Sequence, residues 1–130
     1  MPPIPKTGAE YVAQAGQYPE FYPYFQGSAE VNGQTVALLA KPEMLELVNQ
    51  LGAGAERVSV SFDGTFHTTP RPWKQMFCVF VRIGRHSFAV GHCLMTNRRG
   101  PTYDAALDLL FSLLPDVFPS HCMSDWETAR

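Results

Sequence analysis

The run Val58-Ser59-Val60-Ser61-Phe62-Asp63-Gly64 decides how the rest of the chain is interpreted. Apolar and small polar side chains alternate from Arg57 to Phe62, and this alternation predicts a β-strand with one buried face. Asp63 and Gly64 follow where we expect that strand to end. A carboxylate in such a position is either an ordinary turn residue or a ligand at the edge of a sheet.

Two further strands are predicted downstream, over 75–83 and 87–95, after a loop over 67–73. Only the turn Gly84-Arg85 separates the two strands, so we expect them to pair antiparallel. Their apolar runs are nearly continuous, which favours strands covered on both faces.

A helix over 101–114 follows, with Pro101 in its first turn and Pro115 ending it. A short strand over 121–124 then leads to Asp125. The helix is a crossover connection, which favours a parallel return of the last strand to the first. The predicted fold class is therefore α/β with a mixed sheet: three antiparallel strands, a crossover helix and a parallel fourth strand.

The residues before this core divide into two parts. Residues 1–27 are rich in proline and aromatic residues, and we expect an irregular arm or a linker whose aromatics pack on the body. Residues 28–56 predict a β-hairpin around Asn32-Gly33 and a short helix from Pro42 to Gly52. The core itself is assigned to 57–130.

Composition indicates one globular domain, because 45% of the 130 residues are hydrophobic and 17% are charged. No apolar run is long enough for a membrane span, and the first residues lack a signal peptide, so we expect a nuclear or cytoplasmic protein without membrane contact. The three cysteines do not suggest a disulfide framework.

Charge is distributed unevenly along a chain whose net charge is -2. Between Arg57 and Arg99 there are seven basic residues and a single acid, Asp63. A lone carboxylate in a basic segment indicates a metal ligand beside a phosphate-binding surface, or else a solvated sheet edge with ordinary charges. The candidate DNA-contacting residues of this segment are Arg71, Lys74, Arg98 and Arg99.

Asp63 and Asp125 follow the first and fourth strands of the predicted sheet. If those strands are parallel neighbours, both carboxylates lie at one edge, where a divalent cation would relieve their repulsion. Oxygen ligands suit Mg²⁺ or Mn²⁺, and such ions activate a water or hydroxyl for attack on a phosphodiester. The alternative is that each aspartate is a turn residue or a helix cap.

Several motifs stand in a fixed order around the two aspartates. They are Asp63-Gly64-Thr65-Phe66, Pro70, Gln75-Met76, Ala89-Val90-Gly91-His92-Cys93-Leu94-Met95-Thr96-Asn97, Thr102-Tyr103 and Met123-Ser124-Asp125-Trp126-Glu127-Thr128-Ala129. In this order and spacing they resemble the transposase domain of Mutator-like elements (MULEs). The resemblance extends from Val58 to Arg130, and Trp126 stands where the family has phenylalanine.

The resemblance implies a ribonuclease H-like fold and a DDE-type DNA cleavage and strand-transfer activity that needs Mg²⁺ or Mn²⁺. It makes Asp63 the first catalytic, metal-binding acid and Asp125 the second, with DNA as the partner. The family's third acid lies on a later helix, beyond position 130, and Glu127 is too close to Asp125 to replace it. We therefore expect a partial core that is incomplete and inactive alone, and whether it is an enzyme stays open.

Three other interpretations are weighed against this one. A domesticated, non-catalytic module would use the open sheet edges for a protein partner or for homo-oligomerisation. A zinc site from His92-Cys93 and His121-Cys122 is disfavoured, because neighbours in a strand point to opposite faces. Cys78 lies in an apolar strand, where burial should raise its thiol pKa, so it is not expected to act as a nucleophile.

Overall fold

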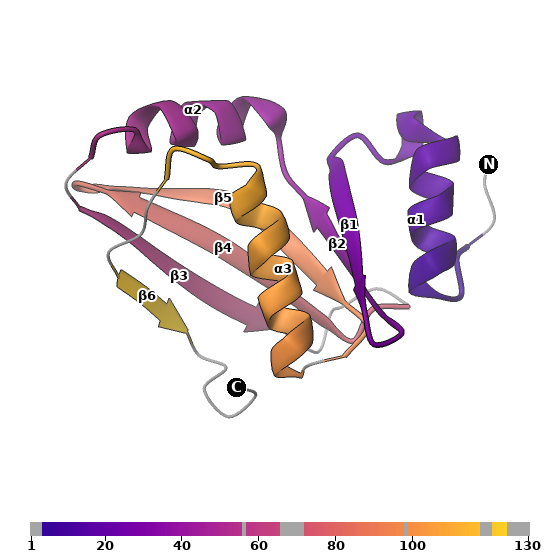
Figure 1. The fold of residues 1–130 in the computed structure, drawn as a ribbon. Coiled ribbons are helices and arrows are strands. Elements are labelled where there is room, and N and C mark those ends of the chain that lie inside the picture. Colours follow the sequence, from indigo (N-terminus) through magenta and orange to yellow (C-terminus); the bar gives the residue numbers. More distant parts are fainter. Residues whose placement is uncertain (1–3, 56, 66–71, 98, 118–120, 125–130) are drawn as a thin grey trace.

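The protein is described here from a computed structural model, over residues 4–55, 57–65, 72–97, 99–117 and 121–124. One mixed sheet carries the fold, with its strands in the order β1-β2-β5-β4-β3-β6 (Figure 1). The mixed α/β class predicted from the sequence is confirmed. The strands are β1 (Phe25–Val31), β2 (Gln34–Leu39), β3 (Val58–Thr65), β4 (Gln75–Ile83), β5 (His86–Met95) and β6 (His121–Ser124).

Three α-helices accompany the sheet in the described part of the chain. They are α1 (Gly8–Gln17), α2 (Pro42–Gly52) and α3 (Gly100–Ser112), and a short 3-10 helix, η1 (Pro19–Phe21), follows α1. Figure 1 shows α3 crossing in front of the sheet, α2 along its upper rim, and α1 beside the β1–β2 hairpin.

Strands β1 to β5 form an antiparallel sheet. The β1–β2 hairpin turns at Asn32 and Gly33, whose positive φ angles of 50° and 78° fit the turn predicted from this dipeptide. β2 then pairs with β5, which brings the hairpin into the same sheet as the three strands after it. β6 lies at the other edge and pairs parallel with β3, with Ser124 opposite Phe62.

Strand β3 is longer than predicted. The sequence suggested that it ends before Asp63, but its ladder with β4 continues through the pair Asp63–Cys78 to Thr65–Met76. Asp63 therefore lies inside the strand rather than in a turn after it. Backbone pairing with β4 overrides the local turn preference of Asp-Gly, because each further pair satisfies backbone hydrogen bonds.

The N-terminal segment is also different from its prediction, because α1 is a regular helix within the expected irregular arm. Its residues lie between Pro5 and Pro19 and include no proline, so no backbone donor is lost inside the helix. The side-chain oxygen of Thr7 caps it by accepting from the backbone N–H of Glu10 at 3.1 Å.

The main core lies on one face of the sheet, beneath α2 and α3. Phe77, Val79 and Val81 of β4 are fully buried there, against Val48 of α2 and Leu110 of α3. Their neighbours Met76, Cys78 and Phe80 point to the other face and are half-buried. The expectation that the strands are covered on both faces is therefore met under α2 and α3 and only in part on the other face.

A smaller cluster covers part of the second face. Trp73 is buried against Ala37 and Leu94, and the ring of Tyr11 from α1 meets it edge-on, with centroids 5.1 Å apart. Tyr11 of the N-terminal segment thus packs on the body as expected, whereas Phe21 and Tyr24 are 51% and 49% exposed. α1 shields the β2–β5 side of this face.

Candidate functional site

Asp63 lies near the end of β3, on the face of the sheet away from α2 and α3. Its side chain is exposed, while its strand neighbour Phe62 points into the main core. Across the sheet it pairs with Cys78 of β4, which in turn pairs with His92 of β5. A carboxylate in this position is accessible to a cation or a solvated ligand.

Asp125, the second predicted acid, lies outside the described residues. The residue before it, Ser124, ends β6 and pairs with Phe62, which is the residue before Asp63. Backbone pairing thus brings the segment that leads to Asp125 beside the segment that leads to Asp63.

The described residues fit a divalent cation only in part. Asp63 supplies a hard, exposed oxygen ligand of the kind that Mg²⁺ and Mn²⁺ bind. Within the described ranges, no group of three or more His, Cys, Asp or Glu side chains is arranged to hold a metal ion. Further ligands would have to come from Asp125, water or a bound phosphate.

The two described thiols are both poor nucleophiles. Burial, with a smaller contribution from the Asp63 carboxylate, raises the pKa of Cys78 above its usual value. Burial raises the pKa of Cys93 still further, because that side chain is fully buried. The prediction that Cys78 has a raised pKa is confirmed.

His92 and Cys93 do not join in a metal site. His92 is exposed and Cys93 is buried, as expected for neighbours on opposite faces of β5. The side chains of His121 and Cys122 lie outside the description.

Two of the four candidate DNA-contacting residues, Lys74 and Arg99, are among the described residues, and both lie toward the same end of the sheet as Asp63. Lys74 precedes β4, is exposed, and is held by a 2.9 Å hydrogen bond from its backbone N–H to the carbonyl of Met95. Arg99 is exposed at the start of α3. Arg71 and Arg98 lie outside the described residues.

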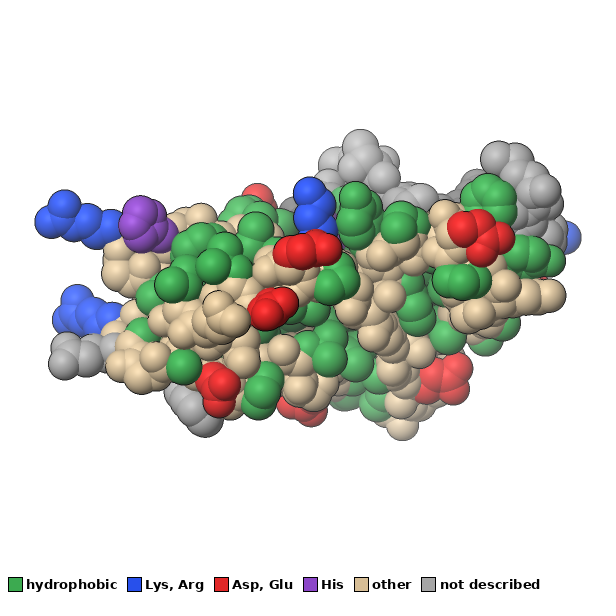
Figure 2. Space-filling view, turned by 90° about the horizontal axis from the view of Figure 1, so that it is seen from above, with side chains coloured by type: hydrophobic (Ala, Val, Ile, Leu, Met, Phe, Trp, Pro, Cys, Tyr) green, Lys and Arg blue, Asp and Glu red, His purple; other side chains and the backbone are tan. Residues whose placement is uncertain are grey.

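The other basic residues of this segment lie at the opposite end of the sheet. Arg82 pairs with Ser59 near the start of β3, Arg57 precedes that strand, and Arg85 lies in the β4–β5 turn. Seen from above in Figure 2, basic side chains project at the left end, where Figure 1 has that turn. The basic residues between Arg57 and Arg99 are therefore divided between the two ends of the sheet, because the chain reverses direction at each antiparallel strand.

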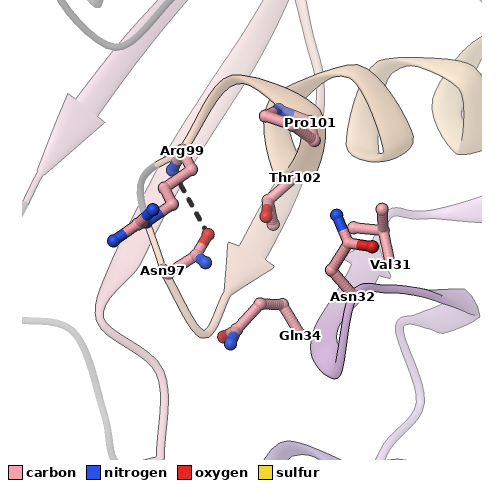
Figure 3. Close-up of a pocket in the computed structure, with 7 residues that line it drawn as sticks. All are labelled: Val31, Asn32, Gln34, Asn97, Arg99, Pro101 and Thr102. Carbon is pink, nitrogen blue, oxygen red and sulfur yellow. Dashed lines mark hydrogen bonds between the residues drawn. The ribbon is translucent and has the colours of Figure 1, made fainter.

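Sequence analysis missed a polar pocket at the end of β5. It lies between the β1–β2 turn and the start of α3, has a volume of about 380 Å³, and brings together residues from three separate segments (Figure 3). It is lined by Val31, Asn32, Gln34, Asn97, Arg99, Pro101 and Thr102. Asn97 and Thr102 stand in the motifs quoted from the sequence, and Asn32 stands in the predicted turn, but no sequence pattern predicted that these residues meet in one pocket.

Gln75 is a further polar residue of this end of the sheet. It opens β4, is 1% exposed, and its Oε1 has no hydrogen-bond partner among the described residues. Its Nε2 makes a long contact of 3.4 Å with the carbonyl of Met76. A buried acceptor left unpaired is costly, so Gln75 marks a strained point beneath this edge.

Comparison with known proteins gives no match: no family model, no curated protein and no solved structure corresponds to this chain. In the described residues, no helix combines the length and apolar character needed to cross a membrane.

Proposed function

We propose that this chain forms part of the metal-dependent core of a MULE-type DDE transposase. In this proposal Asp63 and Asp125 bind Mg²⁺ or Mn²⁺, and the sheet edge beside them binds DNA. The proposed activity is DNA cleavage and strand transfer. It rests on the sequence motifs around the two aspartates.

The parallel pairing of β6 with β3 is the observation that supports this proposal most strongly. The resemblance implies a ribonuclease H-like sheet, in which the strand of the second acid lies parallel to the strand of the first. The order β5-β4-β3-β6, with α3 between β5 and β6 in the chain, is compatible with it. The pair Phe62–Ser124 lies one residue before each acid.

The chemistry follows from two carboxylates at one edge. Like charges a few Å apart repel, and a divalent cation between them removes that cost. The cation supplies Lewis-acid activation of a water or a hydroxyl for attack on a phosphodiester. Asp63 would hold the cation through an exposed oxygen, and the neighbouring half-buried surface of β4 limits access from one side.

Metal binding tests the proposal directly. Calorimetric titration of the protein with Mg²⁺ and Mn²⁺ should give a binding heat that is lost in Asp63→Asn and in Asp125→Asn. Asp108→Asn, which changes an exposed carboxylate on α3, is the matched control and should leave the heat unchanged. Absence of any heat in the unmodified protein, or equal heats in all variants, would rule the site out.

A second candidate function is a non-catalytic interaction module. β1 and β6 are the two edges of the sheet, and each has one strand neighbour in the described structure. Unpaired strand edges accept a further strand from a partner or from a second copy. Light scattering during size-exclusion chromatography should then show an oligomer, whereas a monomer at millimolar concentration would contradict self-association.

A further inference from the structure

One side of α2 carries an apolar surface that the core does not bury. Leu47 and Leu51 are 41% and 46% exposed and lie one helical turn apart. Met44 lies one turn before Leu47 on the same side and is half-buried. Figure 2, which looks down on α2, shows hydrophobic side chains gathered next to the basic side chains of the left end. Met44, Leu47 and Leu51 together form the α2 stripe.

A hollow continues from the α2 stripe onto β5. It has a volume of about 450 Å³ and lies between Met44 and residues 89–92, with apolar side chains forming most of its lining. The hollow forms because β2 leaves the sheet after Leu39 to enter α2, so β2 pairs with β5 only from His92 onward. A Cβ at Gly91 would lie 2.8 Å from the carbonyl oxygen of Leu39, so this exit of β2 depends on glycine.

The charges at the two ends of α2 have opposite signs. Glu43 and Glu46 lie in its N-terminal half and are exposed. Beyond its C-terminal end lie Arg57, which precedes β3, and Arg85, in the β4–β5 turn, and both are exposed. Figure 1 shows the end of α2 and this turn at the same end of the sheet. A second copy that runs antiparallel along α2 would therefore set each acidic half against a basic end.

Two further charges near α2 leave this pattern in place. Lys41 precedes the helix, and its Nζ lies over the ring of Tyr24, 6.0 Å from the ring centroid, so it offsets one of the two acidic charges. Asp116 is held at Asn49, whose Oδ1 accepts from the backbone N–H of Asp116 at 2.8 Å. Asn49 is two residues from both Leu47 and Leu51, which places it and Asp116 on the opposite side of the helix.

We propose that the α2 stripe and its hollow form the interface of a symmetric dimer, in which the α2 helices of two copies pack antiparallel. A two-fold interface uses the same surface twice and must be self-complementary. This surface combines a protruding Leu51 with a hollow beside Met44, and antiparallel packing sets each leucine against the hollow of the other copy. Glu43 of each copy then faces Arg85 of the other at the rim. The interface uses neither the sheet edges nor Asp63.

Sedimentation equilibrium measures the dimer directly. The unmodified protein should be a dimer that dissociates on dilution, and a monomer at every concentration would overturn the proposal. Leu51→Gln should raise the dissociation constant about a hundredfold, because a two-fold interface loses the apolar side chain twice. Ile4→Gln changes a side chain that is 83% exposed before α1 and should leave the constant unchanged. Equal effects of the two variants would also overturn the proposal.

A charge exchange tests the antiparallel arrangement. At low salt, Glu43→Arg and Arg85→Glu should each weaken the dimer about tenfold, because like charges then face each other across the interface. Both substitutions in one chain should restore the affinity, since each pair forms again with its signs exchanged. Both positions are exposed, and thermal unfolding checks that each variant keeps its fold. Failure of the double variant to recover would show that these residues do not face each other.

Dilution of the ¹⁵N-labelled protein locates the interface. The amide signals of Leu47, Leu51 and Ala89 should move as the dimer dissociates, whereas that of Ser28 in the edge strand β1 should stay in place. Movement confined to β1 or β6 would mean that the copies pair through their sheet edges, and the proposal would be wrong. Asp63→Asn should leave the dimer unchanged, so failure of the metal site and failure of this interface give different results.

Discussion

Phe77 is the residue at which the two layers of the main core meet. It is fully buried in β4, and its ring lies 5.9 Å from Phe62 of β3 and 5.6 Å from Tyr103 of α3. Phe77→Ala should lower the free energy of unfolding by about 3–5 kcal/mol, because the site cannot collapse around the lost ring. Urea denaturation measures this loss.

Phe21 is the matched control for that measurement, since it is 51% exposed in η1. Phe21→Ala should change the free energy of unfolding by less than about 1 kcal/mol. Comparable losses in the two variants would mean that Phe77 is not at the centre of the core.

The thiol pKa of Cys78 depends on Asp63, which lies opposite it in the β3–β4 ladder. Its thiol pKa is raised by burial first and by the Asp63 carboxylate second, so the thiolate forms only above its usual pH range. Asp63→Asn removes the repelling charge, which should lower the pKa and move the pH profile of Cys78 alkylation to lower pH. Burial remains, so the profile should shift only part of the way.

Mass spectrometry of the peptide that contains Cys78 follows this reaction separately from the other cysteines. Cys93 is the internal control, because its fully buried thiol should stay unmodified in the folded protein at every pH that preserves the fold. An unchanged profile for Cys78 in Asp63→Asn would show that the carboxylate does not act on this thiol.

At the level of the elements, the β1–β2 turn depends on a backbone conformation that glycine favours. Gly33 has a φ of 78°, where a side chain is strained even though a Cβ would meet no atom within 4 Å. Gly33→Ala should lower the free energy of unfolding by about 1–2 kcal/mol. Thermal or urea unfolding measures the change.

Gly16 of α1 offers the opposite case for the same substitution. A Cβ there also meets nothing within 4 Å, but the residue lies in a helix, where alanine is favoured over glycine. Gly16→Ala should therefore raise the free energy of unfolding by up to about 1 kcal/mol. A similar loss in both variants would mean that the turn geometry is not the cause.

Elements with a strong local signal are the ones that the sequence predicted. Asn32-Gly33 defines its hairpin, and Pro42 and Gly52 define α2, because turn and helix-end preferences act over a few residues. The helix α1 was missed because the prolines around it dominated the segment. The end of β3 was missed because its last pairs depend on β4, which no local pattern reveals.

The residues of the candidate site also differ in whether a local sequence pattern could reveal them. Asp63 stands out in the sequence because it is the single acid of a basic segment. The polar pocket at the end of β5 does not, because Gln34, Asn97 and Thr102 come together only when the hairpin pairs with β5. A site made by long-range contacts leaves little trace in one sequence.

Across the whole molecule, the folded sheet separates charges that are neighbours in the sequence. Arg57, Arg82 and Arg85 lie at the start of β3, about 17 Å from Asp63 at roughly 3.3 Å per residue, whereas Lys74 and Arg99 lie at its end. The net charge of -2 rules out general attraction to DNA. Under the proposed function, DNA binding would then depend on the few cations at the Asp63 end of the sheet.

The salt dependence of DNA binding tests this division. If Arg71, Lys74, Arg98 and Arg99 each contact one phosphate of a single strand, the logarithm of the affinity should fall with the logarithm of salt with a slope of about -3. Lys74→Ala should reduce that slope by about 0.7, because one fewer counterion is released. Arg82→Ala removes an equal charge at the far end and should leave the slope unchanged. Fluorescence anisotropy with a labelled oligonucleotide measures both, and an equal effect of the two variants would mean that DNA does not follow the edge beside Asp63.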